Sequence, residues 1–393
     1  MPGSFDTQAF VAAVERAVAR PSGQAISLHE PHFGGNEWSY VKECLDTGWV
    51  SSVGAYVTRF EGMLAEFTGV RHAVAVVNGT AALHLCLELA GVRRDEEVLT
   101  PCLTFIATAN AVSYCGASPH FVDVGHDNLG MDPDKLASHL EDVGDMRSEG
   151  CFNRLTGRRI AAALPMHAFG LPADMDAIIA VCERYRIPVV EDAAESLGST
   201  YKGRHTGNSG LVAALSFNGN KVVTTGGGGA ILTNDPAIGA RAKHLSTTAR
   251  VAHRWSFNHD EIGYNYRMPN LNAALGCAQL EQLPGFLARK RNLAERYAAA
   301  FKGMPGVHVV REPPWGRSNH WLNAVILEGD NADLRDSLLA ATNAAGLMTR
   351  PVWTLMHKLP MYAAYPRMDL SVAEDLERRV INLPSSAMLG DAA

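Results

Sequence analysis

Residues 73–89, AVAVVNGTAALHLCLEL, decide the fold class of this chain. A short β-rich run at 73–77 is followed at once by a turn, Asn78-Gly79-Thr80, that opens a helix through Leu89. The same order of apolar run and helical stretch recurs downstream, with helices expected at 105–114 and 175–185. Further short apolar runs lie at 97–100, 120–123, 160–165, 188–191, 213–217 and 229–233. The pattern predicts an α/β fold with a mostly parallel, seven-stranded sheet covered by helices on both faces.

The rest of the 393-residue chain predicts a second, smaller domain, because this length exceeds the usual size of a single core. Apolar residues at helical spacing predict an amphipathic helix over 5–19. After about residue 265 the pattern changes to long helices, at 271–283 and 284–301, followed by strands near 307–310 and 321–327. We expect an N-terminal helix within 1–25, a large domain over 26–265 and a small C-terminal domain over 266–393.

Composition narrows the class of partner. The formal net charge is −6, from 35 Lys and Arg against 41 Asp and Glu, so neither nucleic acid nor a membrane surface is expected as a partner. Seven cysteines occur singly, without a CxxC pair or metal-ligand spacing, which indicates reduced thiols and no metal. The N-terminus lacks the layout of a signal peptide, and no apolar run reaches the ~20 residues that span a bilayer. We expect a cytoplasmic protein that acts on a small molecule.

A lysine beside four glycines is the strongest local signal. Residues 216–230 read SFNGNKVVTTGGGGA and place Lys221 between a predicted strand end and the glycines, which let the backbone approach a ligand closely. An amine at a strand end can bond covalently to a cofactor aldehyde and later move a proton at the substrate carbon. The alternative is a glycine-rich turn that carries a solvated lysine.

Acidic residues follow another predicted strand, in PVVEDAAE at 188–195. Open α/β sheets bind ligands at the carboxyl ends of their strands. A carboxylate there, Asp192 by preference, would keep the pyridine nitrogen of a bound cofactor protonated, since a pyridinium needs an adjacent anion. The alternative is that these acids only cap a helix.

Two further segments could complete such a site. The turn at Gly79 and Thr80 joins a strand to a helix, where free amides and a hydroxyl form an anion site, and Ser216 would add a donor. Phe105 follows a predicted strand and could stack on a flat ring. Helix capping and core packing are the alternatives. Together with Lys221 and Asp192, these residues supply each part of a pyridoxal-phosphate site.

Several motifs in this order resemble those of the DegT/DnrJ/EryC1/StrS family of sugar aminotransferases. The similar segments are NGTAALHL (78–85), TPCLTFIATANAV (100–112), FGLPADMDAI (169–178), VVEDAAESLGS (189–199), SFNGNKVVTTGGGG (216–229) and GYNYRMPNLNAALGCAQL (263–280). The segments 27–54 and 318–327 are more similar to the branch associated with legionaminic acid and bacillosamine-type sugars. The resemblance implies the fold of type I pyridoxal-phosphate enzymes.

The resemblance also implies a role for each site residue. Lys221 would hold pyridoxal 5'-phosphate covalently, and Asp192 would pair with its ring nitrogen. Glu195 falls where the family places a polar side chain near the pyridoxal hydroxyl. Asn265, with Arg267, would reach the phosphate in a partner subunit, which implies a homodimer. The phosphate and the ring would contact Gly79, Thr80, Ser216 and Phe105.

The expected activity is transfer of an amino group, from glutamate, to the C4 ketone of a UDP- or GDP-linked 4-keto-6-deoxy sugar in bacterial surface-glycan biosynthesis. The family commonly has glutamate where this chain has Gly227, which affects substrate detail more than the reaction. Related dehydratases carry histidine in place of Lys221. The alternatives are a non-catalytic sensor or structural protein with this fold, and a dinucleotide-dependent oxidoreductase, although no GxGxxG follows the first strand. Loops near Trp49, His320 and Trp353 would select the sugar.

Overall fold

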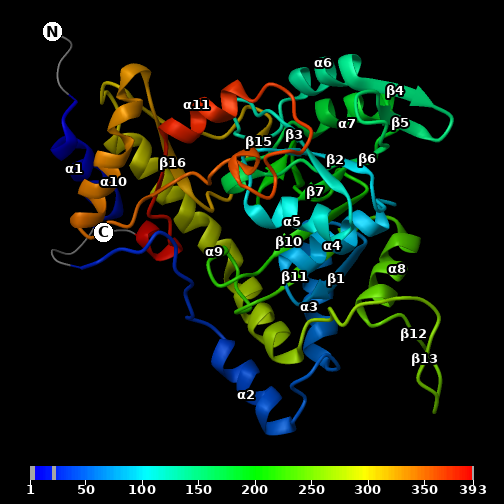
Figure 1. Cartoon of the computed structure of the whole chain (residues 1–393). Helices are drawn as coiled ribbons and strands as arrows, with labels where there is room; N and C mark the ends of the chain where they lie inside the picture. Colours follow the sequence, from blue (N-terminus) through cyan, green and yellow to red (C-terminus); the bar gives the residue numbers. More distant parts are fainter. Residues whose placement is uncertain (1–4, 20–23, 392–393) are drawn as a thin grey trace.

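The structure is a computed structural model that describes residues 5–19 and 24–391 (Figure 1). Part of the expected N-terminal segment 1–25 therefore lies outside the described residues. Within the described ranges no helix is long and apolar enough to cross a membrane.

Seven strands in the described part of the chain form the central sheet, in the order β1-β11-β10-β7-β6-β2-β3. Parallel bridges from Ala163 to Val189 and from Met166 to Asp192 join its two hydrogen-bonded halves. β11 alone runs in the direction opposite to the other six strands, so the predicted mostly parallel sheet is confirmed. The strands are β1 (His72–Val76), β2 (Glu97–Pro101), β3 (Ser118–Val122), β6 (Ile160–Ala163), β7 (Val190–Asp192), β10 (Val212–Ser216) and β11 (Gly229–Thr233).

Helices cover both faces of this sheet, as its buried strands require. Alternate side chains divide the strands between two cores: Val76 and Ile231 pack with α4 and α8, whereas Ala75 and Leu232 pack with α3 and α9. The helices around the sheet are α3 (Ala55–Thr68), α4 (Gly79–Leu89), α5 (Ile106–Tyr114), α6 (Pro133–Val143), α7 (Met175–Arg184) and α8 (Pro236–Ser246), and α2 (Glu37–Thr47) packs on the long helix α9.

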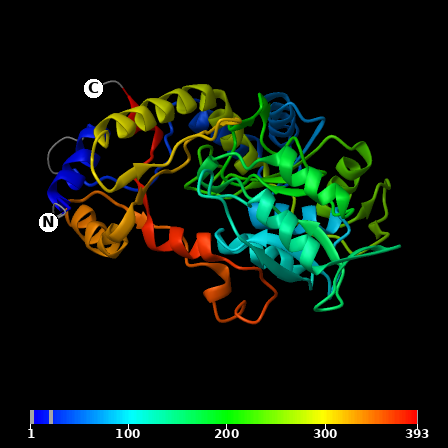
Figure 2. The ribbon, with the colours of Figure 1, turned by 90° about the horizontal axis from the view of Figure 1, so that it is seen from above.

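One long helix, α9 (Asn270–Ala300), replaces the two helices expected at 271–283 and 284–301. That expectation was wrong at Pro284, which lies inside α9. A proline removes one backbone hydrogen bond and usually kinks or breaks a helix. Here α9 packs on α2 and α3 before the proline and on α1 (Thr7–Val18) after it, so tertiary contacts hold both halves in one helix (Figure 2).

The C-terminal part contains an antiparallel sheet in the order β14-β16-β18-β17. The N-terminal helix α1 packs here, where Phe10 lies against Phe301. Because α9 contributes to this core and to the large one, the division at about residues 25 and 265 stays a prediction. The elements are β14 (Val307–Val309), β16 (Asn323–Leu327), β17 (Arg350–Pro351), β18 (Val380–Leu383), α10 (Arg335–Ala344) and α11 (Ser371–Arg379).

Short hairpins and turns complete the described chain. The hairpin of β12 and β13 extends from the end of α8 (Figure 1). The small strands are β4 (Gly144–Arg147), β5 (Gly150–Asn153), β8 (Thr200–Tyr201), β9 (Arg204–His205), β12 (Arg250–Val251), β13 (Asn258–His259) and β15 (Gly316–Arg317), and the 3-10 turns are η1 (Ala168–Gly170), η2 (Gly329–Leu334), η3 (Met356–Lys358) and η4 (Ala387–Gly390).

Candidate active site

A cavity of about 360 Å³ lies at the carboxyl ends of the parallel strands. Residues that directly follow β1, β6, β7 and β10 line it, as the general rule for open α/β sheets predicts. Most residues singled out in the sequence meet here. The lining includes Asn78, Gly79, Thr80, Phe105, Thr108, Met166, Asp192, Glu195, Ser216, Asn218, Asn220, Lys221, Trp321 and Trp353.

Lys221 lies in a turn after β10, and its side chain is only 13% exposed. The ammonium nitrogen Nζ donates to Glu195 Oε1 at 3.2 Å and lies 3.8 Å from the centre of the Trp321 ring. The amine is therefore held inside the cavity between a carboxylate and an aromatic face. This placement does not fit the alternative of a solvated lysine in a glycine turn.

The glycines bring two backbone segments into close contact beside the amine. A Cβ on Gly229 would lie 2.5 Å from the carbonyl carbon of Asn78, and a Cβ on Gly79 would lie 2.8 Å from Cβ of Ser216. Side chains at these positions would push β10 and β11 away from the turn. The turn opens α4, where Asn78 Oδ1 accepts from Ala81 N, and the first amides of a helix have no intrahelical acceptor. Gly79 and Thr80 thus offer free amides to an anion.

Asp192 is 2% exposed and lies at the end of β7. Its Oδ2 accepts from Thr108 Oγ1 at 2.7 Å, and its Oδ1 accepts from the amide of Ala194 at 3.1 Å. Burial raises the pKa of the Asp192 carboxyl, and the bond from Thr108 offsets part of that effect. A protonated ring nitrogen beside this carboxylate would restore its charged form, so the residue suits the role predicted for it.

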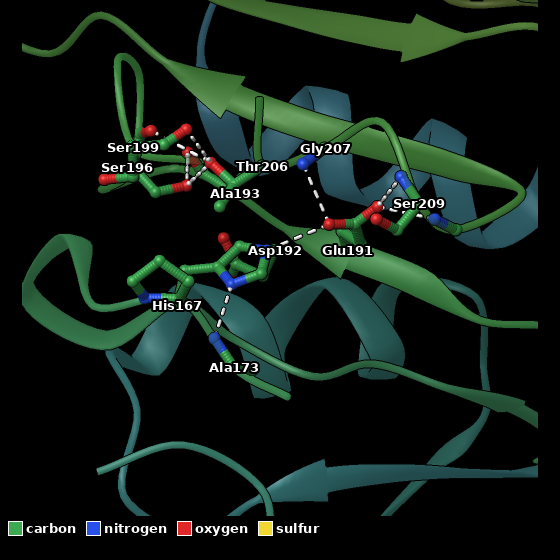
Figure 3. A network of polar contacts seen from close by, with 12 residues as sticks. His167, Ala173, Glu191, Asp192, Ala193, Ser196, Ser199, Thr206, Gly207 and Ser209 are labelled. Carbon is green, nitrogen blue, oxygen red and sulfur yellow. Dashed lines mark hydrogen bonds and ion pairs between the residues drawn. The ribbon is translucent and has the colours of Figure 1, made fainter. Parts of the chain in front are cut away.

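The neighbouring Glu191 holds this strand end in place (Figure 3). Its carboxylate accepts from His167 Nε2 at 2.9 Å and from the amides of Gly207 and Ser209 at 2.8 Å each. His167 Nδ1 accepts from the amide of Ala173, so Nε2 carries the proton. Burial alone would raise the pKa of Glu191, but these hydrogen bonds hold it below its usual value. Two loops are thereby fixed against β7, directly before Asp192.

Glu195 is also buried, 3% exposed, and faces the lysine. Its Oε2 accepts from the amide of Phe169 at 2.9 Å, and its Oε1 accepts from Lys221 Nζ. Burial raises the pKa of this carboxyl to about 7, against the attraction of Lys221. Near neutral pH the group can therefore take up or return a proton beside the amine.

Phe105 precedes α5, lines the cavity and is 49% exposed. The alternative of a core phenylalanine does not fit this exposure. Asn265 is exposed outside the cavity, where its backbone pairs with Thr247. Arg267 lines a separate cavity of about 530 Å³ together with Trp49. Within one chain the structure therefore does not bring Asn265 or Arg267 to Lys221.

Thr108 and Trp321 are the main lining residues that sequence reasoning missed. Thr108 follows Phe105 by three residues, so its place in the same motif was a usable signal. Trp321 precedes β16, at least 100 residues from every lining group except Trp353, and no local chemical pattern marks it. Three loops were expected to select the sugar. Trp353 lines the cavity, whereas Trp49 lines the separate one and His320, half-buried beside Glu312, lines neither.

The lining fits pyridoxal phosphate. It combines a reachable amine on Lys221, a buried carboxylate on Asp192, helix amides at Gly79 and Thr80 for a phosphate, and the open ring of Phe105. When bound, this cofactor supplies an electron sink for reactions at the carbon next to an amino nitrogen. The residues present provide the groups that would hold it.

The sequence is similar to those of known sugar aminotransferases. Residues 31–393 match the model of the DegT/DnrJ/EryC1/StrS aminotransferase family. The chain is 38% identical over 371 residues to GDP-perosamine synthase of Caulobacter vibrioides, covering 93% of this chain and 95% of the relative. It is 37% identical to GDP-perosamine synthase of Escherichia coli O157:H7 over 366 residues, with 93% and 94% covered.

Solved structures agree with the sequence relatives. The aminotransferase TlmJ from Streptoalloteichus hindustanus superposes with a TM-score of 0.83 at 29% identity, over 92% of this chain and 94% of that one. The likeness expected to the legionaminic acid and bacillosamine branch is not supported by relatives named GDP-perosamine synthases. The protein is a pyridoxal-phosphate-dependent nucleotide-sugar aminotransferase of fold type I. The chain belongs to the DegT/DnrJ/EryC1/StrS aminotransferase family.

Proposed function

We propose that this enzyme transfers the amino group of glutamate to the C4 ketone of a GDP-linked 4-keto-6-deoxy sugar. The observation that carries the proposal is the contact between Lys221 and Glu195 in a cavity that also holds Asp192. The name GDP-perosamine synthase of two relatives favours GDP over UDP as the carrier. A role in bacterial surface-glycan synthesis and a cytoplasmic location stay predictions.

Lys221 has two roles in this proposal. Its amine holds the cofactor covalently in the resting enzyme and, once released, moves a proton at the carbon that loses or gains nitrogen. Glu195 lies 3.2 Å from that amine and can exchange a proton with it near pH 7. Trp321 covers the amine with its ring and keeps bulk water away from it.

The remaining residues position the cofactor. Asp192 keeps the ring nitrogen protonated, which maintains the electron sink. Gly79, Thr80 and Ser216 would hold the phosphate, and Phe105 would pack against the ring. These roles follow from the chemistry of the lining groups and from the family resemblance.

The proposal includes a homodimer in which Asn265 reaches the phosphate bound to the partner subunit. The exposure of Asn265 outside its own cavity supports this arrangement. Mixing inactive Lys221→Ala subunits with Asn265→Ala subunits tests it, because a mixed dimer then contains one complete site. Recovery of activity on mixing supports the exchange across subunits, and no recovery places Asn265 outside the shared site.

A substrate panel tests the reaction itself. Purified enzyme is incubated with glutamate and each of several UDP- and GDP-linked 4-keto sugars, and the products are analysed by mass spectrometry. We expect a 4-amino sugar only from a GDP-linked 4-keto-6-deoxy sugar, with formation of 2-oxoglutarate. Turnover of UDP-linked sugars alone would contradict the carrier, and loss of the visible absorbance with no sugar product would contradict the acceptor class.

A further inference from the structure

A second cavity, of about 590 Å³, adjoins the first one. Both cavities are lined by Asn220, Trp321 and Trp353. The other walls of the second cavity come from residues 27–30, from the segment 348–351 and from Asn382 on β18. The cavity therefore lies where the N-terminal segment and the C-terminal sheet meet the lysine turn. Nothing in the proposed roles above uses it.

Buried polar atoms in this lining lack partners. Both ring nitrogens of His29 and the Oδ1 atom of Asn382 are buried without a hydrogen bond. The amide nitrogen of Asn382 donates to Pro351 O, so only its acceptor side is free. Buried polar atoms in native proteins are nearly always paired. Three unpaired atoms around one cavity therefore indicate a ligand that supplies the missing partners.

The chemistry of the lining indicates a neutral ligand. Burial, together with the charges of Lys290 and Lys221, lowers the pKa of His29 well below its usual value, so its ring is neutral and offers one donor and one acceptor. Asn382 offers a neutral acceptor. Two charged residues of opposite sign also line the cavity. The Glu30 carboxylate accepts from Ser27 Oγ, and the Arg350 guanidinium donates to Asn343 Oδ1 and Thr349 O, so both already have partners. Because these two charges cancel, the unpaired neutral groups of His29 and Asn382 favour a neutral ligand over a second carboxylate such as that of the amino donor.

Two indole rings supply the apolar surface of the cavity. Trp321 is fixed because its Nε1 donates to Asn220 O at 2.7 Å, and the Trp353 ring lies 5.0 Å from the Phe169 ring. Aromatic faces beside a few neutral polar groups suit a ligand with both C–H faces and hydroxyl groups. The Trp321 ring also faces Lys221 Nζ, so a ligand that packs on this ring lies next to the amine.

We propose that the second cavity binds the hexose ring of the nucleotide sugar, with His29 and Asn382 hydrogen-bonded to its hydroxyl groups and the ring packed against Trp321 and Trp353. The inference rests on the proposed function, since it assumes a nucleotide sugar as the acceptor. The inference assigns recognition of the sugar to His29, in the segment 27–30, and to Asn382, on β18, neither of which is needed to hold the cofactor.

Binding of an unreactive ligand tests this separately from turnover. A GDP-hexose with a hydroxyl group at C4 is titrated into the holoenzyme while tryptophan fluorescence is followed. His29→Ala should weaken binding about tenfold, the effect of one lost hydrogen bond. His29→Gln, which keeps a donor and an acceptor, should recover part of it. The matched control is His308→Ala, an exposed histidine on β14 that should bind like the wild type.

Two further measurements separate the outcomes. The rate at which glutamate bleaches the visible absorbance should not change in His29→Ala, and GDP alone should bind equally to both proteins. A slower glutamate step with unchanged GDP-hexose binding assigns the cavity to the amino donor and overturns the inference. An equal loss of GDP binding assigns it to the nucleotide and also overturns it. If the wild type reacts with glutamate but binds no nucleotide sugar, the proposed function fails as well.

Discussion

Two lysines contact Trp321 from different regions of the molecule, and their surroundings differ. In the turn after β10, Lys221 points its amine at the ring, pairs with Glu195 and borders an open cavity. In the middle of α9, Lys290 is fully buried and donates to three carbonyl oxygens, those of His320, Trp321 and Ser385. An ammonium has three donors, so Lys290 is saturated. A buried lysine is available for chemistry only where its amine faces a cavity.

The two lysines also have different roles, one structural and one chemical. Lys290 joins α9 to the segment before β16 and to the residues after β18, so it holds the backbone that carries Trp321. The Trp321 ring therefore keeps its position next to the amine of Lys221. We therefore expect substitutions at 221 to affect chemistry and substitutions at 290 to affect stability.

The largest effect is expected from Lys221→Ala. Amine transfer should fall by at least about a thousandfold, because the residue that binds the cofactor and moves the proton is lost. Product formation by mass spectrometry and visible absorbance after dialysis measure the two losses. The melting temperature should stay within a few degrees of the wild type.

Lys202→Ala is the matched control for this variant, because Lys202 is an exposed lysine paired with Asp176. It should keep full turnover. Normal amine transfer in Lys221→Ala would refute the assignment of the catalytic lysine. A large drop in its melting temperature would contradict the claim that Lys221 serves chemistry and Lys290 serves stability.

Lys290→Met should show the reverse pattern. Three buried carbonyl oxygens lose their donor, which we expect to lower the free energy of unfolding by about 2–4 kcal/mol. Turnover at temperatures where the variant is folded should fall far less than in Lys221→Ala. Urea unfolding and steady-state rates measure the two quantities. A stable but inactive Lys290→Met protein would contradict the claim that Lys290 serves stability and not chemistry.

The pH dependence of stability sharpens the test. Burial lowers the pKa of Lys290 to about 7, whereas a lysine in an unfolded chain titrates near ~10.4. Between these values the unfolded chain binds more protons, so this group makes the free energy of unfolding rise with pH. The gap between wild type and Lys290→Met should therefore widen from pH 7 to pH 10. A constant gap would mean that the ammonium stays charged throughout.

The same contrast shows what sequence could predict. Short apolar runs marked the seven strands, and Lys221, Asp192 and the turn at Gly79 stood out because each lies next to a strand end in one local motif. Lys290 sits in an ordinary amphipathic helix, and its three acceptors come from residues 30 to 95 positions away. The antiparallel direction of β11 and the survival of α9 through Pro284 are likewise set by tertiary packing, which no local pattern encodes.

An intermediate effect is expected from Thr108→Val, which removes the hydroxyl that donates to Asp192. The change keeps the shape of the side chain. Loss of a hydrogen bond to a charged group should lower turnover roughly ten- to hundredfold. Because that bond lowers the pKa of Asp192, the acid limb of the rate profile should shift to higher pH. Thr342→Val, at a buried threonine of α10 that bonds to Thr349 and does not line the cavity, is the control, and an equal loss there would assign the effect to packing.

The smallest effect is expected from Gly227→Ala, at the position where relatives commonly carry glutamate. A Cβ there would have no neighbour nearer than the carbonyl oxygen of Val77 at 3.9 Å, so alanine fits without strain. It should stabilise the fold by about 0.4–1 kcal/mol, because the unfolded chain loses conformational freedom.

Gly229→Ala is the contrast, since its Cβ would meet the backbone of Asn78 and Gly79 within 2.7 Å and force the phosphate turn away from β11. Thermal unfolding and cofactor affinity should separate the two variants; equal loss in both would mean that the whole glycine run, and not the close approach at 229, maintains the site beside Lys221.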